Sequence, residues 1–579
     1  MNYLNPIYTE KADCQDCYKC VRNCPVKAIR VENGSATVIY EQCILCGGCV
    51  EVCPPGAKKV RDDLPGLRQI IASGRRVILS LAPSYISEFN QTGIPQMITG
   101  LKRLGFFGIS ETALGAQEVS ANCAHLLSES QNAQKRIFIS SACPSVVEYI
   151  LKYEPSKAGY ITPFLSPMLS HARMLKEFYG SDTSVVFAGP CIAKKKESDL
   201  FPDLVEAVIT FEDLTKWLQQ EKIDLNSISP EPDAQFIPRR AFEGALYPVE
   251  GGMNAGIKKD ASAVSSTFMS FSGIPNISRA LNDLENYPLR ENLFLELLAC
   301  EGGCINGPKT NTPSSTVIKR LSVIDNAVLP DEPSHLAPVM DISRRFDNTE
   351  VKHLHYGEDD IRKMLQTIGK TVPKDELNCA GCGYNTCRDF AVSLLDGKSE
   401  TKQCVSYMRV LAQKKANALI QTMPSGVVIV DDKLRIVECN KIFATLMGEE
   451  TMMLYDVRPG LEGAMLQKIM PSYKLFQTVL ETGNDIVGKE LSFNNTVLLF
   501  SIFTIEKERI VGGIFRDITE PWVRKEQVVN KAREVIKKNL STVQKIAYLL
   551  GENAAESEVI LNGIIESFST NKIDDIEDE

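Results

Sequence analysis

The sequence predicts a multidomain protein of mixed α/β and α+β architecture. The chain has 579 residues, which corresponds to about three to five domains of ordinary size. Eight of its 18 cysteines fall within the first 53 residues, buried-strand patterns alternate with helical patterns in the middle, and alternating strand patterns return near the end. These changes of pattern divide the chain into segments 1–62, 63–350, 351–412, 413–520 and 521–579.

The composition argues against several classes of function. Lys plus Arg number 64 and Asp plus Glu number 73, so the formal charge is −9, which disfavours a general nucleic-acid binder. No apolar run approaches the roughly 18 residues of a membrane helix, and the N-terminus lacks the basic region and apolar core of a signal peptide. We therefore expect a cytoplasmic protein with no membrane partner, whose cysteines are metal ligands or free thiols rather than disulfides.

Segment 1–62 contains the cysteine pattern C-x2-C-x2-C-x3-C-P twice. In such a loop three thiolates hold three corners of an iron–sulfur cubane, and the fourth cysteine reaches the other cluster. The sequence therefore predicts two [4Fe-4S] clusters, the first held by Cys14, Cys17, Cys20 and Cys53 and the second by Cys43, Cys46, Cys49 and Cys24. Zinc is disfavoured, because structural zinc sites use paired C-x2-C units. The segment resembles a bacterial two-cluster ferredoxin, which implies a ferredoxin-like domain.

Segment 63–350 predicts parallel strands in an α/β domain, and the loops that follow four of these strands are unusual. The loops contain Ala82-Pro83-Ser84, Ser141-Ala142-Cys143-Pro144, Gly189-Pro190-Cys191 and Ala299-Cys300 through Cys304. In parallel sheets, binding sites form outside the carboxyl ends of the strands. Three strand ends that deliver cysteines and a fourth that delivers a proline turn therefore predict one buried metal site.

Three of these segments, S-A-C-P, P-C-x2-K and A-C-x-G-G-C-I-N-G, resemble the signature loops of [FeFe] hydrogenases. The resemblance implies an H-cluster, which is a [4Fe-4S] cubane bridged through one thiolate to a di-iron azadithiolate site with CO and CN⁻ ligands. It assigns the cubane to Cys143, Cys191, Cys300 and Cys304, with Cys304 as the bridge. It further implies that Lys194 hydrogen-bonds one cyanide. The backbone of Ala82, Pro83 and Ser84 would contact the other cyanide.

The chain departs from the most active members of that family around the implied site. They have cysteine where this chain has Ala142, and a methyl group cannot relay protons. They have methionine at the positions of Gly189 and Leu298, and glutamine at the position of Met168. The cluster ligands remain while the proton route changes, a combination that resembles the sensory subgroup of the family. By the same resemblance the site also includes Ser141, Pro167 and Pro190.

Glu250 is the candidate for a replacement acid. The acidic relay of the active members becomes Asn122 and Cys123, and loss of a general acid costs a factor of about 10²–10⁴ in rate. Glu250 lies in Y-P-V-E-G-G-M, which resembles the glycine-rich segment that lines the pocket in the family. The alternative is a partly solvated loop carboxylate, the common state of glutamate.

Segment 351–412 has a different cysteine spacing, C-x2-C-x4-C-x16-C, made by Cys379, Cys382, Cys387 and Cys404. A helical pattern over 388–395 would bring the last cysteine back to the loop. The segment resembles the small helical [4Fe-4S] domain of several anaerobic redox proteins. Zinc is the alternative, because four thiolates also satisfy tetrahedral Zn²⁺. With the H-cluster cubane, the chain is thus expected to hold four [4Fe-4S] clusters.

Segment 413–520 resembles a PAS domain, with paired strands, a helix over 443–447 and a terminal D-I-T motif. No histidine follows His355, so this domain cannot bind haem through histidine. Segment 521–579 is expected to be helical, with apolar residues seven apart at Val529, Ile536, Val543 and Leu550. Such a seam, with Asn539 setting the register, favours a parallel homodimer. The alternative is that the same face packs within its own chain.

The sequence therefore predicts a cytoplasmic H2 sensor with low turnover, a hydrogenase that interconverts H2 with protons and electrons and passes its redox state to a PAS output. The expected partners are H2 and protons, a redox protein such as ferredoxin, an unknown signalling protein and a second copy of the chain. Two alternatives remain. One is a ferredoxin-linked catalytic hydrogenase with an added PAS domain. The other is a hydrogenase-like Fe–S assembly or electron-transfer protein without the di-iron site.

Overall fold

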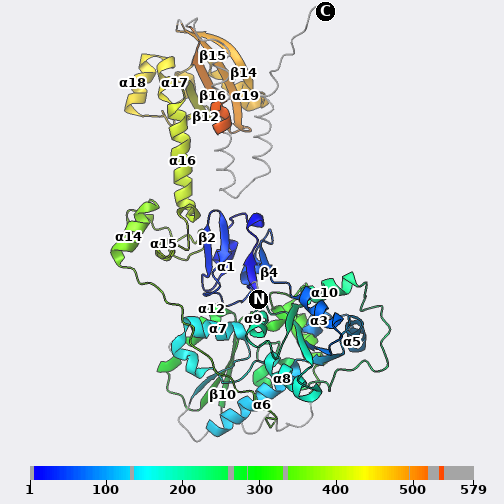
Figure 1. The fold of residues 1–579 in the computed structure, drawn as a ribbon. Coiled ribbons are helices and arrows are strands. Elements are labelled where there is room, and N and C mark those ends of the chain that lie inside the picture. The colour runs from blue at the N-terminus through cyan, green and yellow to red at the C-terminus, as the bar shows by residue number, and fades with distance from the viewer. Residues whose placement is uncertain are drawn as a thin grey trace, which may run out of the picture. The chain divides into compact units, whose positions relative to one another are not determined.

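The computed structural model describes residues 5–130, 136–258, 266–282, 284–329, 337–494, 496–519 and 534–539. The chain divides into two compact units, Met1–Gln403 and Cys404–Glu579 (Figure 1). The first unit contains the two-loop cysteine segment, the large central domain and most of the small cysteine-rich segment. No helix in the described ranges is both long and apolar enough to cross a lipid bilayer.

The N-terminal domain has two antiparallel strand pairs and two short helices. Its elements are β1 (Ile7–Thr9) paired with β4 (Lys58–Val60), β2 (Ile29–Glu32) paired with β3 (Ser35–Val38), α1 (Lys19–Asn23) and α2 (Gly48–Glu51). Each helix starts within a cysteine loop and carries the chain to that loop's fourth cysteine. Cys24, for example, is the C-cap of α1. The predicted duplication and ferredoxin-like architecture are therefore confirmed.

The central domain contains two separate parallel sheets. One has the order β6 (Gly108–Glu111), β5 (Val77–Leu81), β8 (Ser184–Gly189) and β9 (Ala207–Thr210), and the other has the order β10 (Ser266–Ser272), β11 (Asn292–Leu298) and β7 (Ile137–Ile139). Strands β5, β8 and β11 are buried along their whole length, as expected for parallel strands covered on both faces. The predicted parallel strands are confirmed, but the sequence did not indicate that they divide between two sheets.

Helices cover the faces of both sheets. They are α3 (Leu64–Ala72), α4 (Tyr85–Glu88), α5 (Ile94–Arg103), α6 (Ala113–Glu129), α7 (Pro144–Tyr153), α8 (Pro167–Tyr179), α9 (Ala193–Leu200), α10 (Phe211–Gln220), α11 (Gly252–Lys258), α12 (Ile274–Leu281) and α13 (Thr316–Asn326). One hydrophobic core surrounds the four-stranded sheet and a second surrounds the three-stranded sheet. Ile44 of the N-terminal domain belongs to the second core, so the two domains share buried contacts.

The small cysteine-rich segment forms two helices, α14 (Glu358–Thr367) and α15 (Cys387–Leu395). Thr386 accepts a hydrogen bond from the Asp389 amide, and the Asp389 carboxylate accepts one from the Thr386 amide, which makes a capping box at the start of α15. The guanidinium of Arg388 donates two hydrogen bonds to the Glu358 carboxylate, at 2.7 and 2.8 Å. The helix predicted over 388–395 is confirmed and begins one residue earlier.

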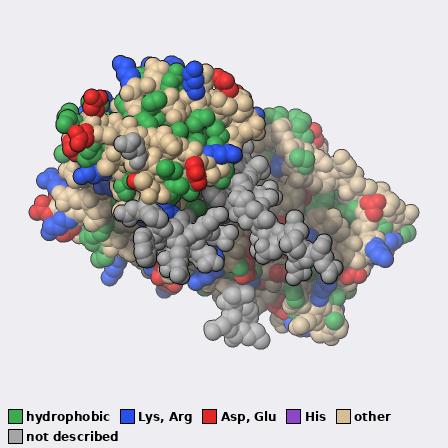
Figure 2. Space-filling view, turned by 90° about the horizontal axis from the view of Figure 1, so that it is seen from above, with side chains coloured by type: hydrophobic (Ala, Val, Ile, Leu, Met, Phe, Trp, Pro, Cys, Tyr) green, Lys and Arg blue, Asp and Glu red, His purple; other side chains and the backbone are tan. Residues whose placement is uncertain are grey.

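The second unit is a long helix followed by a five-stranded antiparallel sheet with helices. Its elements are α16 (Val405–Thr422) and, in sheet order, β13 (Ile436–Cys439), β12 (Gly426–Asp431), β16 (Ile510–Asp517), β15 (Thr496–Glu506) and β14 (Ile486–Phe493), with helices α17 (Lys441–Met447), α18 (Glu449–Val457) and α19 (Lys474–Thr482). Figure 2 looks onto this unit and shows exposed hydrophobic side chains among charged ones. The predicted PAS fold is confirmed, including the helix expected over 443–447.

The D-I-T motif closes the central strand of this sheet. Thr519 Oγ1 accepts a hydrogen bond from the Val497 amide at 3.0 Å, and the Thr519 amide donates to Asp517 Oδ1 at 2.8 Å. The motif therefore ties the end of β16 to the start of β15. The predicted dimer seam lies outside the described residues at Val529, Val543 and Leu550. The described range 534–539 is helical, so the homodimer itself stays a prediction.

Candidate metal centre

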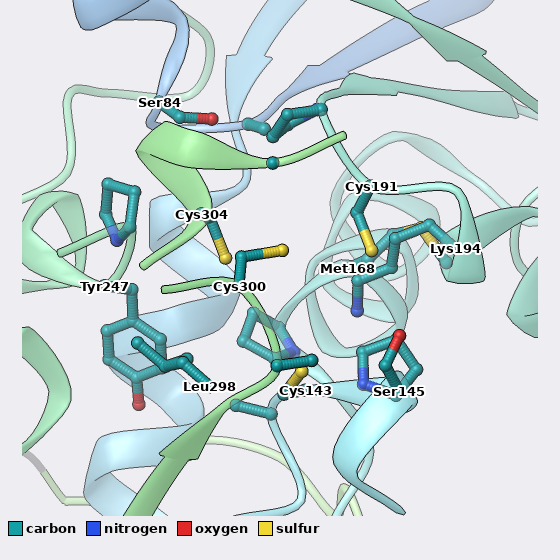
Figure 3. A pocket seen from close by; sticks show the side chains of 18 of the residues that line it. Ser84, Cys143, Ser145, Met168, Cys191, Lys194, Tyr247, Leu298, Cys300 and Cys304 are labelled. Carbon is teal, nitrogen blue, oxygen red and sulfur yellow. The ribbon is translucent and has the colours of Figure 1, made fainter. Parts of the chain in front are cut away.

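A cavity of about 100 Å³ lies at the carboxyl ends of β5, β7, β8 and β11 (Figure 3). Two of these strands belong to each sheet, so the cavity lies where the ends of the two sheets meet. Its walls are almost entirely apolar. The predicted cubane ligands all line it, and these are Cys143, Cys191, Cys300 and Cys304. The convergence predicted from four separate strand ends is thus present in the structure.

The four thiols are close enough to influence one another's ionisation. Burial, with a smaller contribution from a thiolate at Cys143, raises the pKa of Cys191 to about 11. Burial also raises the pKa of Cys300 well above its usual range. The thiolates that add to this effect on Cys300 are Cys304, Cys191, Cys143 and, from the N-terminal domain, Cys46. Thiols gathered around one apolar cavity are suited to a metal cluster, because bound metal replaces the thiol protons and neutralises the thiolate charge.

Lys194 is the one charged residue that lines the cavity. Its side chain is nearly buried, and Nζ donates to Ser166 Oγ at 2.9 Å and to Glu197 Oε2 at 2.6 Å. The other carboxylate oxygen of Glu197 accepts from Arg344 at 3.1 Å. The sequence identified Lys194 but missed Glu197 and Arg344. The residue Arg344 is 150 positions further along the chain, so no local pattern could have connected it to the site.

The loop after β5 supplies a second polar group. Ala82, Pro83 and Ser84 all line the cavity, as predicted. Ser84 Oγ is buried and has no hydrogen-bond partner among the described residues. A buried hydroxyl without a partner is costly unless a ligand satisfies it. The residues present therefore fit a group larger than a cubane, one with acceptor atoms near Lys194 and Ser84.

The other predicted site positions divide into two sets. Those that line the cavity are Ala142, Pro167, Met168, Pro190 and Leu298. Ser141, Gly189 and Glu250 are not among its lining residues. The structure explains the glycine at 189, because an added Cβ would lie 2.6 Å from the ring of Phe187. Phe187 lines the cavity itself and takes the space that a side chain at 189 would need.

Glu250 contacts the loop between Cys300 and Cys304 through a serine. Its Oε2 accepts from Ser272 Oγ at 2.7 Å, and Ser272 Oγ accepts from the Gly302 amide at 3.0 Å. Gly303 is required beside this segment, because its φ is +105° and an added Cβ would lie 2.3 Å from the Pro248 carbonyl oxygen. Glu250 is thus held next to the loop that carries two cluster cysteines, although it does not reach the cavity.

Glu296 is an acidic residue that the sequence analysis missed. It lies on β11, where its carboxylate accepts from the amides of Met253 at 3.3 Å and Asn254 at 3.2 Å, and from Ser270 Oγ at 3.2 Å. Burial raises its pKa to about 7 despite these bonds. A carboxyl that titrates near neutral pH can exchange protons under physiological conditions. The sequence analysis missed it because Glu296 lies within a run of apolar residues, where a single glutamate only interrupts the buried-strand pattern.

The thiols of the two cysteine sets of the N-terminal domain influence one another's ionisation. Burial raises the pKa of Cys20, and the thiolates that raise it further are Cys17, Cys14 and Cys53. Burial likewise raises the pKa of Cys49, with further contributions from Cys43, Cys46 and Cys24. Cys53 thus acts on a thiol of the first loop and Cys24 on a thiol of the second, while the interleaved ligand sets stay a prediction. Cys46 also lines the cavity, which places the second set beside the central site.

The cysteine set of the small cysteine-rich segment has members in both units. Cys379, Cys382 and Cys387 lie in the first unit, and Cys404 begins the second. The Cys387 amide donates to Asn378 Oδ1 at 2.8 Å, which fixes the turn before α15. Within the described ranges, no group of three or more His, Cys, Asp or Glu side chains is arranged around a single metal ion. The ligand set and its metal stay predictions.

The sequence matches four domain families. Residues 75–308 match the iron-only hydrogenase large subunit, C-terminal domain, and residues 6–54 match a 4Fe-4S dicluster domain. Residues 375–406 match an Fe–S cluster family, and residues 415–481 match a PAS domain family. These matches cover each of the segments in which the sequence predicted a cluster or a PAS fold.

Known relatives include more than one kind of protein. Iron hydrogenase 1 of Clostridium pasteurianum is 24% identical over 402 residues, which are 52% of this chain and 70% of that protein. A cytosolic Fe-S cluster assembly factor of Danio rerio is 22% identical over 337 residues, which are 47% of this chain and 79% of that protein. A solved [FeFe]-hydrogenase structure from Chlamydomonas reinhardtii is 18% identical and covers 49% of this chain and 99% of its own, with a TM-score of 0.39.

The four domain matches include the four cysteines of the cavity, both N-terminal cysteine loops, the small cysteine-rich segment and the first two strands of the antiparallel sheet. The chain is therefore a [FeFe]-hydrogenase-like protein with Fe–S and PAS domains.

Proposed function

We propose that this protein is an H2-sensing [FeFe] hydrogenase with low turnover. The observation that carries the proposal is the single apolar cavity in which Cys143, Cys191, Cys300 and Cys304 lie together with Lys194 and Ser84. An H-cluster bound there would supply the reversible interconversion of H2 with two protons and two electrons. Four [4Fe-4S] cubanes, counting that of the H-cluster, and a di-iron site with CO and CN⁻ ligands are the proposed cofactors.

The residues of the cavity would orient this cofactor. The four cysteines would hold the cubane, and Cys304 would also provide the bridging thiolate. Lys194 would donate to an acceptor on the di-iron site, since its ammonium has three donors and only two go to Ser166 and Glu197. Ser84 Oγ would donate to a second acceptor, which satisfies its otherwise unpaired hydroxyl.

Proton handling supports a sensor rather than a high-flux enzyme. Ala142 lines the cavity and has no group that can hold a proton. The nearby carboxyls that could exchange one are Glu296, whose pKa is raised by burial to about 7, and Glu250, which contacts the cysteine loop through Ser272. Neither carboxyl lines the cavity, so protons would have to travel further than in a site with a cysteine at 142. Slow exchange follows from that distance.

The two other functions proposed from the sequence have less support. An assembly or electron-transfer protein without the di-iron site would need the four cysteines, but not an ammonium and an unpaired hydroxyl that line the same cavity. A catalytic hydrogenase with an added PAS domain would be expected to keep a proton donor at 142. A redox protein such as ferredoxin, an unidentified signalling protein and a second copy of the chain are the proposed partners, with the PAS domain as the output.

Infrared spectroscopy of the full chain, produced with the di-iron maturation machinery, tests the proposal. We expect CO and CN⁻ bands that shift reversibly under H2, with turnover well below that of a catalytic hydrogenase. Cys304→Ala should remove the bands. Cys123→Ala is the matched control, because Cys123 is fully buried and belongs to none of the predicted ligand sets. Wild-type protein that takes up its cubanes but shows no CO bands would support the assembly function instead.

A further inference from the structure

The small cysteine-rich segment is docked on the N-terminal domain, within the first unit. Two hydrogen bonds fix one end of the interface. The Val31 amide donates to the Lys398 carbonyl at 2.8 Å, and the Asn33 amide donates to the side-chain oxygen Oε1 of Glu400 at 2.7 Å. At the other end, Arg22 Nη1 donates to the Gly381 carbonyl at 3.1 Å. These contacts join residues more than 350 positions apart in the chain.

The cysteine loop approaches α1 so closely that only glycine fits at one point. Gly383 has φ of +97°, and an added Cβ would lie 2.7 Å from Val21 Cγ1. Gly383 follows Cys382 directly, and Val21 lies between Cys20 and Cys24. Cys20 belongs to the first predicted cluster set and Cys24 to the second. The third set therefore lies against α1, which contains Cys20 of the first set and ends at Cys24 of the second.

Lys27 lies at the centre of this contact. Its ammonium donates to the carbonyls of Val21 at 3.1 Å and Arg22 at 3.2 Å, which satisfies the last turn of α1. It also lies 5.8 Å from the centroid of the Tyr384 ring, on the docked segment. Burial lowers the pKa of Lys27, and nearby Cys24 and Cys382 oppose that effect. One cation is thus close to thiols of two different cluster sets.

A second lysine has the same relation to the first two sets. Lys58 is buried, and its ammonium donates to Thr9 Oγ1 at 3.0 Å. It lowers the pKa of Cys20 of the first set and of Cys49 of the second set, against the dominant effect of burial. Lys58 thus interacts with thiols of the first and second sets, and Lys27 with thiols of the second and third.

We propose that Lys27 is a positioning residue shared by two cluster sites, the second set, which contains Cys24, and the third set, which contains Cys382, and that its charge raises the reduction potentials of both together. A reduced cluster is more negative than an oxidised one, so a fixed cation nearby stabilises the reduced form. The docking of the third set on α1 gives Lys27 this double role. The inference rests on the proposed function, because it takes both sets as iron–sulfur sites.

The test uses the full chain reconstituted with cubanes alone and titrated with reductant under electron paramagnetic resonance. Cluster signals are assigned by their loss in Cys14→Ala, Cys49→Ala and Cys382→Ala. We expect Lys27→Gln to lower the potentials of the second and third sets and to leave the first unchanged. Lys58→Gln should lower those of the first and second sets and leave the third unchanged. Lys27→Arg should retain the wild-type potentials.

The matched control is Lys19→Gln, which removes an exposed lysine from the same helix and should shift nothing. If Lys27→Gln does not take up its clusters, Gly383→Ala provides the second measurement. It should push the docked loop from α1 and lower the potential of the third set while leaving the first unchanged. The proposal is overturned if Lys27→Gln shifts only one set or none, or if Gly383→Ala leaves the third set unchanged. Zinc in the third set would overturn it as well. Because no di-iron site is present in this experiment, a failure to react with H2 has no bearing on it.

Discussion

Lys194 Nζ lies 2.6 Å from Glu197 Oε2, one turn further along α9, and both side chains are almost completely buried. Ser166 donates to the same carboxylate oxygen at 2.9 Å, and Arg344 binds the other. The ammonium that the sequence assigned to the cofactor is therefore held in place by the protein before any ligand binds. Because the Lys194 ammonium is already held in place, ligand binding loses less side-chain entropy than it would with a mobile lysine.

Removal of Lys194 should destabilise the fold as well as the site. Breaking a buried pair leaves an uncompensated charge and typically costs about 3–5 kcal/mol. Because Arg344 still pairs with Glu197, we expect Lys194→Met to fall at or below the lower end of that range. The measurement is denaturant unfolding of the cluster-free protein. Lys216→Met, which removes an exposed i,i+4 partner of Glu212, is the control and should cost less than about 1 kcal/mol. Equal effects for the two variants would show that burial of the Lys194 pair does not matter.

Iron content tests the four predicted cubanes. Sixteen of the 18 cysteines fall into four sets of four. Anaerobic reconstitution without the maturation machinery should therefore give about 16 iron atoms per chain, four for each cubane. Elemental analysis for iron and zinc measures this directly. A plateau near 12 iron atoms with one zinc would identify the set Cys379, Cys382, Cys387 and Cys404 as the zinc site left open by its spacing.

Ala142→Cys should increase H2 turnover. The substitution places an ionisable group on the cavity wall, where the alanine methyl now lies. We expect a gain of about tenfold to a hundredfold, less than the full contribution of a general acid, because Asn122 and Cys123 leave the outer relay incomplete. The assay is H2 oxidation with a dye acceptor, with the infrared spectrum as the check on cofactor integrity. An unchanged rate with an intact spectrum would mean that proton delivery at 142 does not limit the reaction.

Glu296 should make stability depend on pH. Its pKa is raised by burial from 4.5 to about 7, so the folded protein binds a proton that the unfolded chain has lost between these values. Stability should therefore fall as pH rises through that window, by an amount on the order of 3 kcal/mol, and remain low above it. Glu296→Gln should remove this contribution. The comparison is thermal unfolding of both proteins at pH 5 and pH 8. If the loss between the two pH values is the same in both, Glu296 is ionised in the folded state.

The variant Glu296→Gln also tests whether Glu296 transfers protons to the site. If Glu296 holds a proton on its way to the site, Glu296→Gln should lower H2 oxidation by up to about 10²-fold while the infrared bands persist. Glu250→Gln should have a smaller effect, since Glu250 is half-buried and reaches the cysteine loop only through Ser272. Normal turnover in both variants would require a proton route through other residues.

The C-terminal seam predicts the oligomeric state. Burial of side chains such as Ile536 and Val543 contributes roughly 1.5–3 kcal/mol each, enough in sum to favour a dimer. The double substitution of Ile536 and Val543 by Glu should give monomers that still oxidise H2, because the catalytic segment lies far upstream in the chain. Light scattering measures the mass, and Lys537→Glu, at an exposed neighbour, is the control. Dimers that persist in the double variant would indicate that the seam packs within its own chain.

The sequence by itself determined the family of each cysteine-rich segment, and it predicts the cluster ligands. The spacing of two or three residues between cysteines fixes which thiolates can share a cubane, because so short a loop has little conformational choice. The interleaving of Cys24 and Cys53 is predicted from the same spacing, and in the structure Cys53 acts on the ionisation of Cys20 and Cys24 on that of Cys49. The strand patterns that end in cysteines are also local sequence features. They predicted where the cavity lies, although not which other residues line it.

The tertiary structure alone decided which residues surround these ligands. The division of the strands between two sheets, the pairing of Glu197 with Arg344 and the packing of Phe187 on Gly189 all depend on the folded arrangement. The raised pKa of Glu296 comes from burial, and the position of Lys27 between two cysteine sets comes from docking of segments more than 350 residues apart. Burial and long-range contacts are properties of the packed chain, and no local pattern records them.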